Sequence, residues 1–192
     1  MAGNDSDEAL VAQALVDRER FSELVARYQD RIYRLIYRMV GEREDSYDLT
    51  QGTFLQAYAG LRGFHPGGRF SPWLYRIAIN LSLNYLKQRK TPTISLDEGA
   101  EQIPGLFSEA VDPEELIQRQ EAQTAVQRAL LSLPDKYRAV VLLRYRENLR
   151  YEEIANILGL PENTVGTYLF RAKEQLRSKL LESWGDPERS KR

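Results

Sequence analysis

Two stretches of this chain carry polar side chains whose types and spacing suit contact with nucleic acid. The first lies near the C-terminus, where Thr164, Thr167, Tyr168, Arg171 and Gln175 recur at helical spacing. Amide, hydroxyl and guanidinium groups supply the donors and acceptors that match base edges in the DNA major groove. The sequence therefore predicts a DNA-reading helix face, and the alternative is a plain solvated face.

The second stretch places Arg76, Asn80, Asn84 and Lys87 at i, i+4, i+8 and i+11, on one side of another predicted helix. Two asparagines between cations can bond to exposed bases while the cations contact phosphates. Residues 62–69 form a preceding Gly- and Pro-rich loop with aromatic side chains that could stack on unpaired bases. Two other interpretations stay open, a solvated helix face and a loop aromatic tucked into its own core.

Other kinds of chemistry find little support in the sequence. The chain has no cysteine and one histidine, His65, which makes a metal site or a Ser-His-Asp catalytic set a poor hypothesis. No Gly-rich phosphate loop and no recognisable catalytic carboxylate pair occurs. We therefore expect no enzyme activity, no metal and no cofactor.

The C-terminal polar face belongs to a two-helix pattern. Its first helix is expected to turn Tyr151, Ile154, Ala155 and Leu158 inward, and residues 159–161, Gly-Leu-Pro, are typical of a helix end followed by a new start. The second helix has an apolar stripe of its own, formed by Val165, Leu169, Ala172, Leu176 and Leu180. Two helices joined by a short Gly-containing turn predict a helix-turn-helix, with an ordinary helical hairpin as the alternative.

The N-terminal part of the chain also has helical periodicity. A helix is expected from Phe21 until Gly41 ends it, and a second over residues 45–61. A third helix is expected to begin at Ser71 as N-cap and Pro72 as first helical residue. The second of these helices should bury Leu49, Phe54, Leu55 and Tyr58.

Charge and composition divide the chain into segments. Residues 1–90 carry 13 Lys or Arg and 11 Asp or Glu, residues 91–115 carry seven acids and no base, and the remainder carries 14 bases and 10 acids. No strand pattern is visible, so the fold is expected to be all-α, with two small helical domains over residues 1–90 and 114–184. Residues 91–113 form the expected irregular acidic linker and residues 185–192 a frayed tail. The absence of cysteine and of long apolar runs favours a cytoplasmic protein without membrane insertion.

Taken together, the two stretches resemble the extracytoplasmic-function sigma factors, the smallest class of the sigma-70 family. The resemblance covers residues 7–181 and rests on motifs in both halves of the chain. The N-terminal motifs are Asp48-Leu49-Thr50-Gln51 with Phe54, and Phe70-Ser71-Pro72-Trp73-Leu74-Tyr75-Arg76-Ile77-Ala78 with Asn80. The C-terminal motifs are Leu133-Pro134, Tyr151-Glu152-Glu153-Ile154-Ala155, Thr164-Val165 and Arg171-Ala172.

This resemblance implies a subunit that binds core RNA polymerase and directs it to promoters, for a stress or envelope regulon, with the polymerase performing the chemistry. It further implies an anti-sigma factor that holds the protein inactive. The implied contacts to polymerase are Asp48, Gln51, Gly52, Phe54, Gln56 and Tyr58. Those to the unwound −10 strand are Phe64, His65, Arg69, Arg76, Asn80, Asn84 and Lys87. Those to the −35 duplex are Asn163, Thr164, Thr167, Tyr168, Arg171 and Lys173.

The chain departs from the family pattern at three positions. Gly52 stands where a glutamate is common, and Gly166 and Tyr168 stand where the recognition helix commonly has basic residues. Fewer phosphate contacts predict weaker or differently specific −35 binding. Two other functions compete with the sigma-factor hypothesis, a helix-turn-helix regulator that acts without polymerase and a sigma mimic that only binds an anti-sigma factor.

Overall fold

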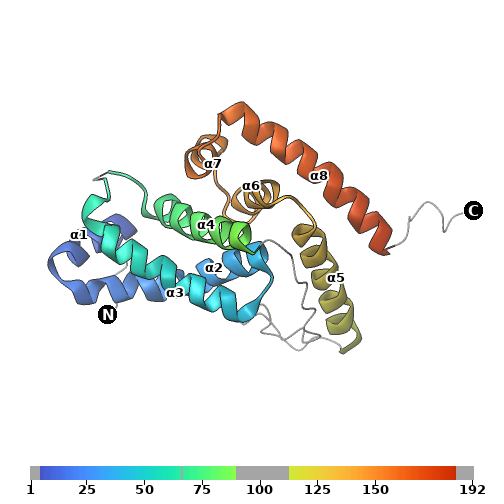
Figure 1. Ribbon diagram of the computed structural model, residues 1–192. Coiled ribbons are helices and arrows are strands. Elements are labelled where there is room, and N and C mark those ends of the chain that lie inside the picture. The colour runs from blue at the N-terminus through green and yellow to red at the C-terminus, as the bar shows by residue number, and fades with distance from the viewer. Residues whose placement is uncertain (1–4, 66, 90–112, 185–192) are drawn as a thin grey trace, which may run out of the picture.

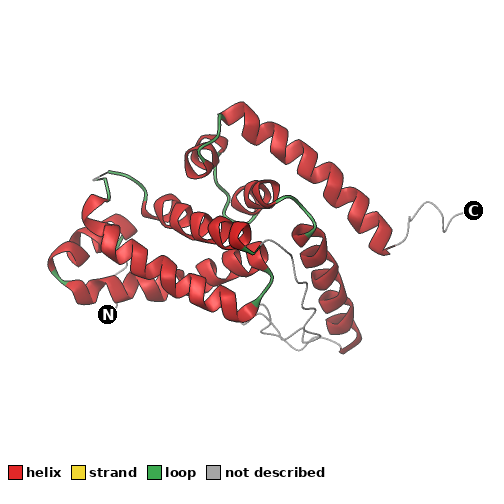
Figure 2. Cartoon of the chain, viewed as in Figure 1, coloured by secondary structure: helices red, strands yellow, loops and turns green. Residues whose placement is uncertain are grey.

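The computed structural model describes residues 5–65, 67–89 and 113–184, and every regular element in these ranges is helical (Figure 2). The expected linker up to residue 112 and the expected tail at 185–192 lie outside them. The N-terminal elements are α1 (Asp7–Val16), η1 (Arg18–Arg20), α2 (Phe21–Val40), α3 (Arg43–Gly60), η2 (Leu61–Gly63) and α4 (Phe70–Gln88). The C-terminal elements are α5 (Pro113–Leu131), α6 (Asp135–Tyr145), α7 (Tyr151–Leu158) and α8 (Glu162–Trp184). The all-α prediction is confirmed. None of the described helices is long and apolar enough to cross a membrane.

Local sequence signals account for several helix ends. Gly41 ends α2 in a left-handed conformation, φ 89°, and its N–H donates to the carbonyl of Tyr37. Gly159 ends α7 in the same way, at φ 61°. Both positions favour glycine because a Cβ is strained at positive φ. The expected start of α4 was wrong by two residues, because Ser71 lies inside the first turn and Arg69 is the N-cap residue.

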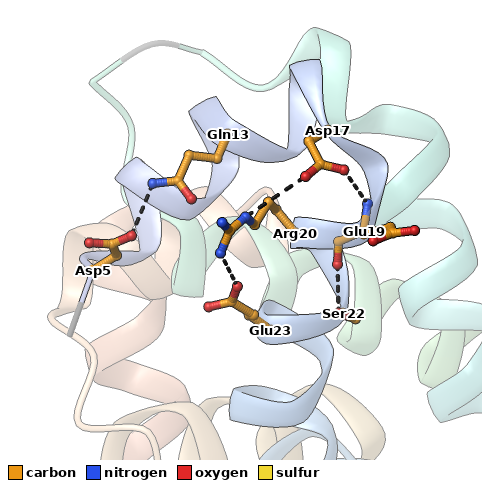
Figure 3. Close-up of polar contacts among 7 residues, drawn as sticks. All are labelled: Asp5, Gln13, Asp17, Glu19, Arg20, Ser22 and Glu23. Carbon is orange, nitrogen blue, oxygen red and sulfur yellow. Dashed lines mark hydrogen bonds and ion pairs between the residues drawn. The ribbon is translucent and has the colours of Figure 1, made fainter. Parts of the chain in front are cut away.

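The turn between α1 and α2 is held by short-range polar contacts (Figure 3). The carboxylate of Asp17 accepts from the N–H of Glu19 at 3.1 Å, and the Ser22 hydroxyl donates to the Glu19 carbonyl at 2.6 Å. Arg20 pairs with Glu23 at 2.7 Å and lies 3.8 Å from Asp17. These pairs are exposed, so they fix the geometry of the turn more than they stabilise the fold.

Helix α3 contradicts part of the predicted core. Phe54 is buried, but Leu55 is 70% exposed and Tyr58 37% exposed. The inner face instead includes Thr50 and Thr53, whose hydroxyls donate to the carbonyls of residues 46 and 49 at 2.7 Å. A hydroxyl that bonds to its own helix can be buried at little cost. Leu55 and Tyr58 of α3 are therefore exposed, contrary to the prediction.

The two halves of the chain pack directly against each other. Figure 1 shows α6 and α7 above α4, with α8 outermost and α5 beside the C-terminal end of α2. Buried apolar residues from both halves form one continuous cluster. The Arg138 guanidinium, from α6, donates both to the Met39 carbonyl at the end of α2 and to the carbonyls of residues 130, 131 and 133. The acidic connection between the halves thus joins elements that are already in contact.

Candidate nucleic-acid interface

Helices α7 and α8 form the predicted helix-turn-helix. Val165 and Ala172 of α8 are fully buried and Leu169 nearly so, in contact with a core that includes Ile154 of α7. Tyr151 departs from its predicted inward position, since it is 40% exposed and its ring lies 5.5 Å from the guanidinium of Arg144. A ring beneath a cation is stabilised without full burial. The buried stripe fixes which face of α8 is left open.

The open face of α8 begins at its N-terminus. Asn163, Thr167 and Arg171 are exposed at intervals of four residues, and Thr164 beside them is half-buried. The Thr167 hydroxyl donates to the Asn163 carbonyl at 3.1 Å. Sequence reasoning missed Phe170, whose side chain is 67% exposed on this same face. A helical projection of residues 163–171 would have found it, because α-helical geometry places it about 20° from Asn163.

Two of the predicted duplex contacts lie elsewhere on α8. The ring of Tyr168 is half-buried and packs against Tyr137 at 4.7 Å. Lys173 is about 200° around the helix from Arg171 and lies over the Tyr145 ring at 5.4 Å. Each of the two side chains thus lies against a tyrosine of α6, and their assignment to the −35 duplex stays a prediction.

Arg171 and Lys173 both keep their positive charge. A hydrogen bond from Arg171 to the Tyr137 hydroxyl, 3.4 Å long, raises the pKa of Arg171. A hydrogen bond to Tyr145 likewise raises the pKa of Lys173. A cation already directed by a tyrosine loses less side-chain entropy when it contacts a phosphate.

Helix α4 presents the second predicted face. Arg76, Asn80, Asn84 and Lys87 are all exposed, while Leu74, Ala78 and Ile79 on the other side are fully buried. Near the C-terminus of α4, Tyr85 donates a hydrogen bond to the Asp45 carboxylate of α3. Burial and this bond raise the pKa of Tyr85 to about 12. The polar stripe is thus carried on a firmly held helix.

The loop before α4 differs from the prediction in one respect. Phe64 is half-buried, and its ring meets Trp73 at 5.3 Å and Phe70 at 6.2 Å, both edge to face. The ring therefore packs against the hydrophobic core and only part of it is open for stacking, because aromatic rings gain from mutual burial. His65 is exposed at the tip of the loop.

Arg69 connects this loop to the other half of the chain. Its guanidinium pairs with the Glu153 carboxylate of α7, which also accepts from the Arg150 N–H at 2.8 Å. The Glu153 side chain is 11% exposed and sits at the N-terminus of α7, where the helix dipole favours an anion. Arg69, a predicted DNA contact, thus forms an ion pair within the protein.

The predicted polymerase contacts lie at an apolar groove of about 620 Å³ between α2 and α3. Gln51, Phe54 and Tyr58 line it, together with Phe21 and Leu55, whereas Asp48 and Gln56 are exposed on α3 without lining it. Gly52 faces α4, since a Cβ placed there would meet the Leu81 side chain at 3.7 Å. Among the described residues, no group of three or more His, Asp or Glu could hold a metal ion.

Family models match the two halves separately. Residues 24–91 match Sigma-70 region 2, and residues 123–176 match Sigma-70, region 4. The first match contains the exposed face of α4 and the groove, and the second contains the helix-turn-helix.

Similar proteins cover most of the chain. The ECF RNA polymerase sigma factor SigW of Bacillus subtilis is 37% identical over 170 residues, 85% of this chain and 90% of SigW. The ECF RNA polymerase sigma-E factor of Escherichia coli K12 is 37% identical over 184 residues, 90% of this chain and 96% of that protein. Both similarities run through the two halves and the connection between them.

Two solved structures share the fold. CnrH, in complex with the cytosolic domain of CnrY, has a TM-score of 0.67 and 25% identity, covering 94% of this chain and all of CnrH. The sigma factor RpoE of Bartonella quintana, in complex with the anti-sigma factor NepR, has a TM-score of 0.63 over 83% of this chain and 96% of that one, at 21% identity.

Proposed function

This chain belongs to the extracytoplasmic-function sigma factors of the sigma-70 family, and from that membership we propose how its exposed faces divide the work of promoter recognition. A sigma factor binds core RNA polymerase and directs it to promoters, and the polymerase performs nucleotidyl transfer. The observation that carries the proposal is the pair of uncovered polar faces, one on α4 and one on α8. Residues 1–90 hold the first face and the polymerase groove, and residues 114–184 hold the second.

The α8 face reads the −35 element as duplex DNA. Asn163, at the start of the helix, suits the paired donor and acceptor of adenine, and Arg171 suits guanine. Phe170 suits the thymine methyl group. Thr164 and Thr167 complete the face, and Lys173 and Tyr168 support it from its edges. A recognition helix enters the major groove with its N-terminal residues in the same way.

The α4 face holds the unwound −10 strand. Asn80 and Asn84 offer both donors and acceptors to bases that have left the stack, while Arg76 and Lys87 neutralise phosphates. His65, which is exposed on the loop, supplies a stacking surface beside the uncovered part of the half-buried Phe64 ring. Arg69 joins this set once it leaves Glu153.

The groove between α2 and α3 takes a polymerase helix. Its apolar lining includes Leu55 and Tyr58, which are 70% and 37% exposed in the free chain. An apolar groove bordered by polar residues such as Gln51 suits an amphipathic helix. Asp48 and Gln56 form a polar rim beside it, and Gly52 supports α3 from the side of α4.

An anti-sigma factor and a cytoplasmic location complete the proposal. The CnrH and RpoE structures each hold a sigma factor together with a protein that binds it. An anti-sigma factor that covers the α2–α3 groove would keep this chain from polymerase. The relatives in Bacillus and Escherichia are polymerase subunits, which supports action where polymerase works.

Run-off transcription with core polymerase tests the function. The promoters are those recovered by sequencing DNA bound to the purified holoenzyme. We expect a promoter-dependent transcript only when this chain is present. Binding to core enzyme without a transcript would favour the sigma mimic, and DNA binding without polymerase association would favour the independent regulator.

Substitutions on the two DNA-reading faces test the division of work. Asn80→Ala with Asn84→Ala should impair strand opening while leaving binding to duplex −35 DNA unchanged. Arg171→Ala should weaken duplex binding and lower the slope of log affinity against log salt by about one unit. Equal effects of both changes on duplex binding would contradict the assignment. Gln123→Ala on exposed α5 serves as the matched control.

A further inference from the structure

A second cavity lies where the two halves of the chain meet, away from the exposed faces of α4 and α8. It has a volume of about 160 Å³ and is bounded by α2 on one side and by the end of α6 on the other. Its lining residues are Arg31, Arg34, Leu35, Arg38, Leu142, Arg146 and Glu147.

The charges around this cavity are not balanced. Four guanidinium groups face one carboxylate, and that carboxylate is already engaged, because Arg31 Nε lies 2.6 Å from Glu147 Oε2. Burial alone would lower the pKa of Arg31, but Glu147 raises it overall. Among the described residues, no carboxylate forms an ion pair with Arg34, Arg38 or Arg146. The residues lining the cavity therefore carry four positive charges and one negative charge, a net charge of +3.

Arg38 shows the effect of this imbalance most clearly. Burial, and then the positive charges of Arg146 and Arg34, lower its pKa. Its one recorded hydrogen bond is a long one, 3.5 Å to the Arg34 carbonyl. Like charges held together with their donors only partly satisfied destabilise a protein unless an anion neutralises them.

A phosphate group fits these requirements better than other anions. Guanidinium groups present fixed forks of N–H donors that match phosphate oxygens two at a time. A phosphate also carries more than one charge and several acceptor oxygens, which suits three converging cations better than one carboxylate does. The small volume limits the ligand to a compact group.

We propose that this cavity is a binding site for a phosphate group, held by Arg34 and Arg38 of α2 and by Arg146 at the end of α6. The group belongs either to a small free phosphate or diphosphate compound or to a nucleic-acid backbone. Because its ligands come from both halves of the chain, a bound phosphate ties α2 to α6 and stabilises their contact.

Calorimetric titration of the full chain with inorganic pyrophosphate tests this site, at constant ionic strength with chloride as the balancing ion. We expect saturable binding and a rise in the thermal midpoint that chloride does not give. Arg34→Gln with Arg146→Gln should weaken binding by at least about tenfold, the loss expected for one charge-assisted hydrogen bond. Arg18→Gln, an exposed arginine of η1, is the matched control and should bind normally.

A second measurement separates a ligand site from a merely structural cluster. In phosphate-free buffer of low salt, Arg146→Gln should raise the thermal midpoint, because it removes repulsion that nothing offsets. A structural arginine would lower the midpoint instead, and that result would overturn the proposal. So would pyrophosphate binding that is absent, or that persists in the double variant.

Competition identifies the source of the phosphate. If a short DNA duplex without promoter elements displaces pyrophosphate from the wild-type chain, and Arg146→Gln weakens that duplex, the ligand is a nucleic-acid backbone. If pyrophosphate binds equally well with and without the duplex, the ligand is a small free phosphate compound.

Discussion

At the scale of single residues, the glycines at positions 52 and 166 affect how α3 and α8 pack against their neighbours. Both lie inside helices, and both stand where the family commonly has a charged residue. A Cβ at Gly52 would meet Leu81 at 3.7 Å, and one at Gly166 would meet Tyr151 at 3.7 Å, which are ordinary contacts. Gly52 thus faces α4, and Gly166 faces α7.

Alanine at either position should stabilise the fold. Gly52→Ala and Gly166→Ala each should raise the free energy of unfolding by about 0.5–1 kcal/mol, because alanine restricts the unfolded chain and fits the space. Gly41→Ala is the opposing control, since Gly41 has φ 89° and its Cβ would come within 2.9 Å of Leu131. Urea unfolding measures all three, and destabilisation by the first two would contradict the expected fit.

The raised pKa of Tyr28 predicts that the free energy of unfolding falls at high pH. Burial, and then a hydrogen bond to the Asp7 carboxylate, raise the pKa of Tyr28 to about 12. Its pKa in the unfolded chain is about 10. A raised pKa gives a stabilisation that is complete below pH 10 and is lost as pH rises toward 12. Tyr28→Phe should flatten this alkaline slope in unfolding experiments between pH 9 and about 12. If the slope is unchanged in Tyr28→Phe, other titrating groups cause the alkaline loss of stability.

At the scale of elements, Arg138 joins the ends of two helices from different halves. Its guanidinium is 4% exposed and donates to the carbonyls of Leu130, Leu131 and Leu133 near the end of α5, and to Met39 at the end of α2. Burial lowers the pKa of Arg138 while Asp135, 3.5 Å away, opposes that effect. Carbonyls at helix ends need such donors because no further turn supplies them.

Removing this cap should destabilise the whole fold. Arg138→Gln leaves several buried carbonyls without a donor, so the free energy of unfolding should fall by about 3 kcal/mol. Arg128→Gln on the exposed side of α5 serves as control and should change it by less than about 0.5 kcal/mol. Equal effects of the two substitutions in urea unfolding would show that the hydrogen bonds of Arg138 to the helix ends do not stabilise the fold.

At the scale of the whole molecule, the ion pair between Arg31 and Glu147 holds the halves together beside the cationic cavity. The Glu147 side chain is 5% exposed, whereas that of Arg31 is 45% exposed. Burial, and then the charge of Glu147, raise the pKa of the buried Tyr75 hydroxyl in α4. The Glu147 carboxylate thus interacts with Arg31 of α2 and with Tyr75 of α4.

Glu147→Ala should loosen the arrangement of the two halves. The interface should lose about 2 kcal/mol, less than for a fully buried pair because Arg31 is partly hydrated. Since the chain has no cysteine, dyes at Ala59→Cys of α3 and Ser178→Cys of α8 report the separation. Energy transfer should fall relative to a Glu44→Ala control in phosphate-free buffer. Unchanged transfer would mean that apolar contacts alone hold the halves.

The sequence by itself determined the family, the all-α class and the main helix ends. Gly41, Gly159 and the motifs around Trp73 and Ile154 act locally, so their consequences could be predicted without tertiary contacts. The exposed faces of α4 and α8 were predicted for the same reason, since helical periodicity alone separates a buried stripe from an exposed one.

Tertiary structure decided which apolar side chains stay exposed and which polar ones are engaged. Leu55 lies outside because Thr50 and Thr53 satisfy their hydroxyls within α3, and Phe64 is half-buried because Phe70 and Trp73 receive its ring. The pairs Arg69–Glu153 and Arg31–Glu147 join residues 84 and 116 positions apart. Periodicity carries no information at such separations, because these contacts depend on how the two halves of the chain pack.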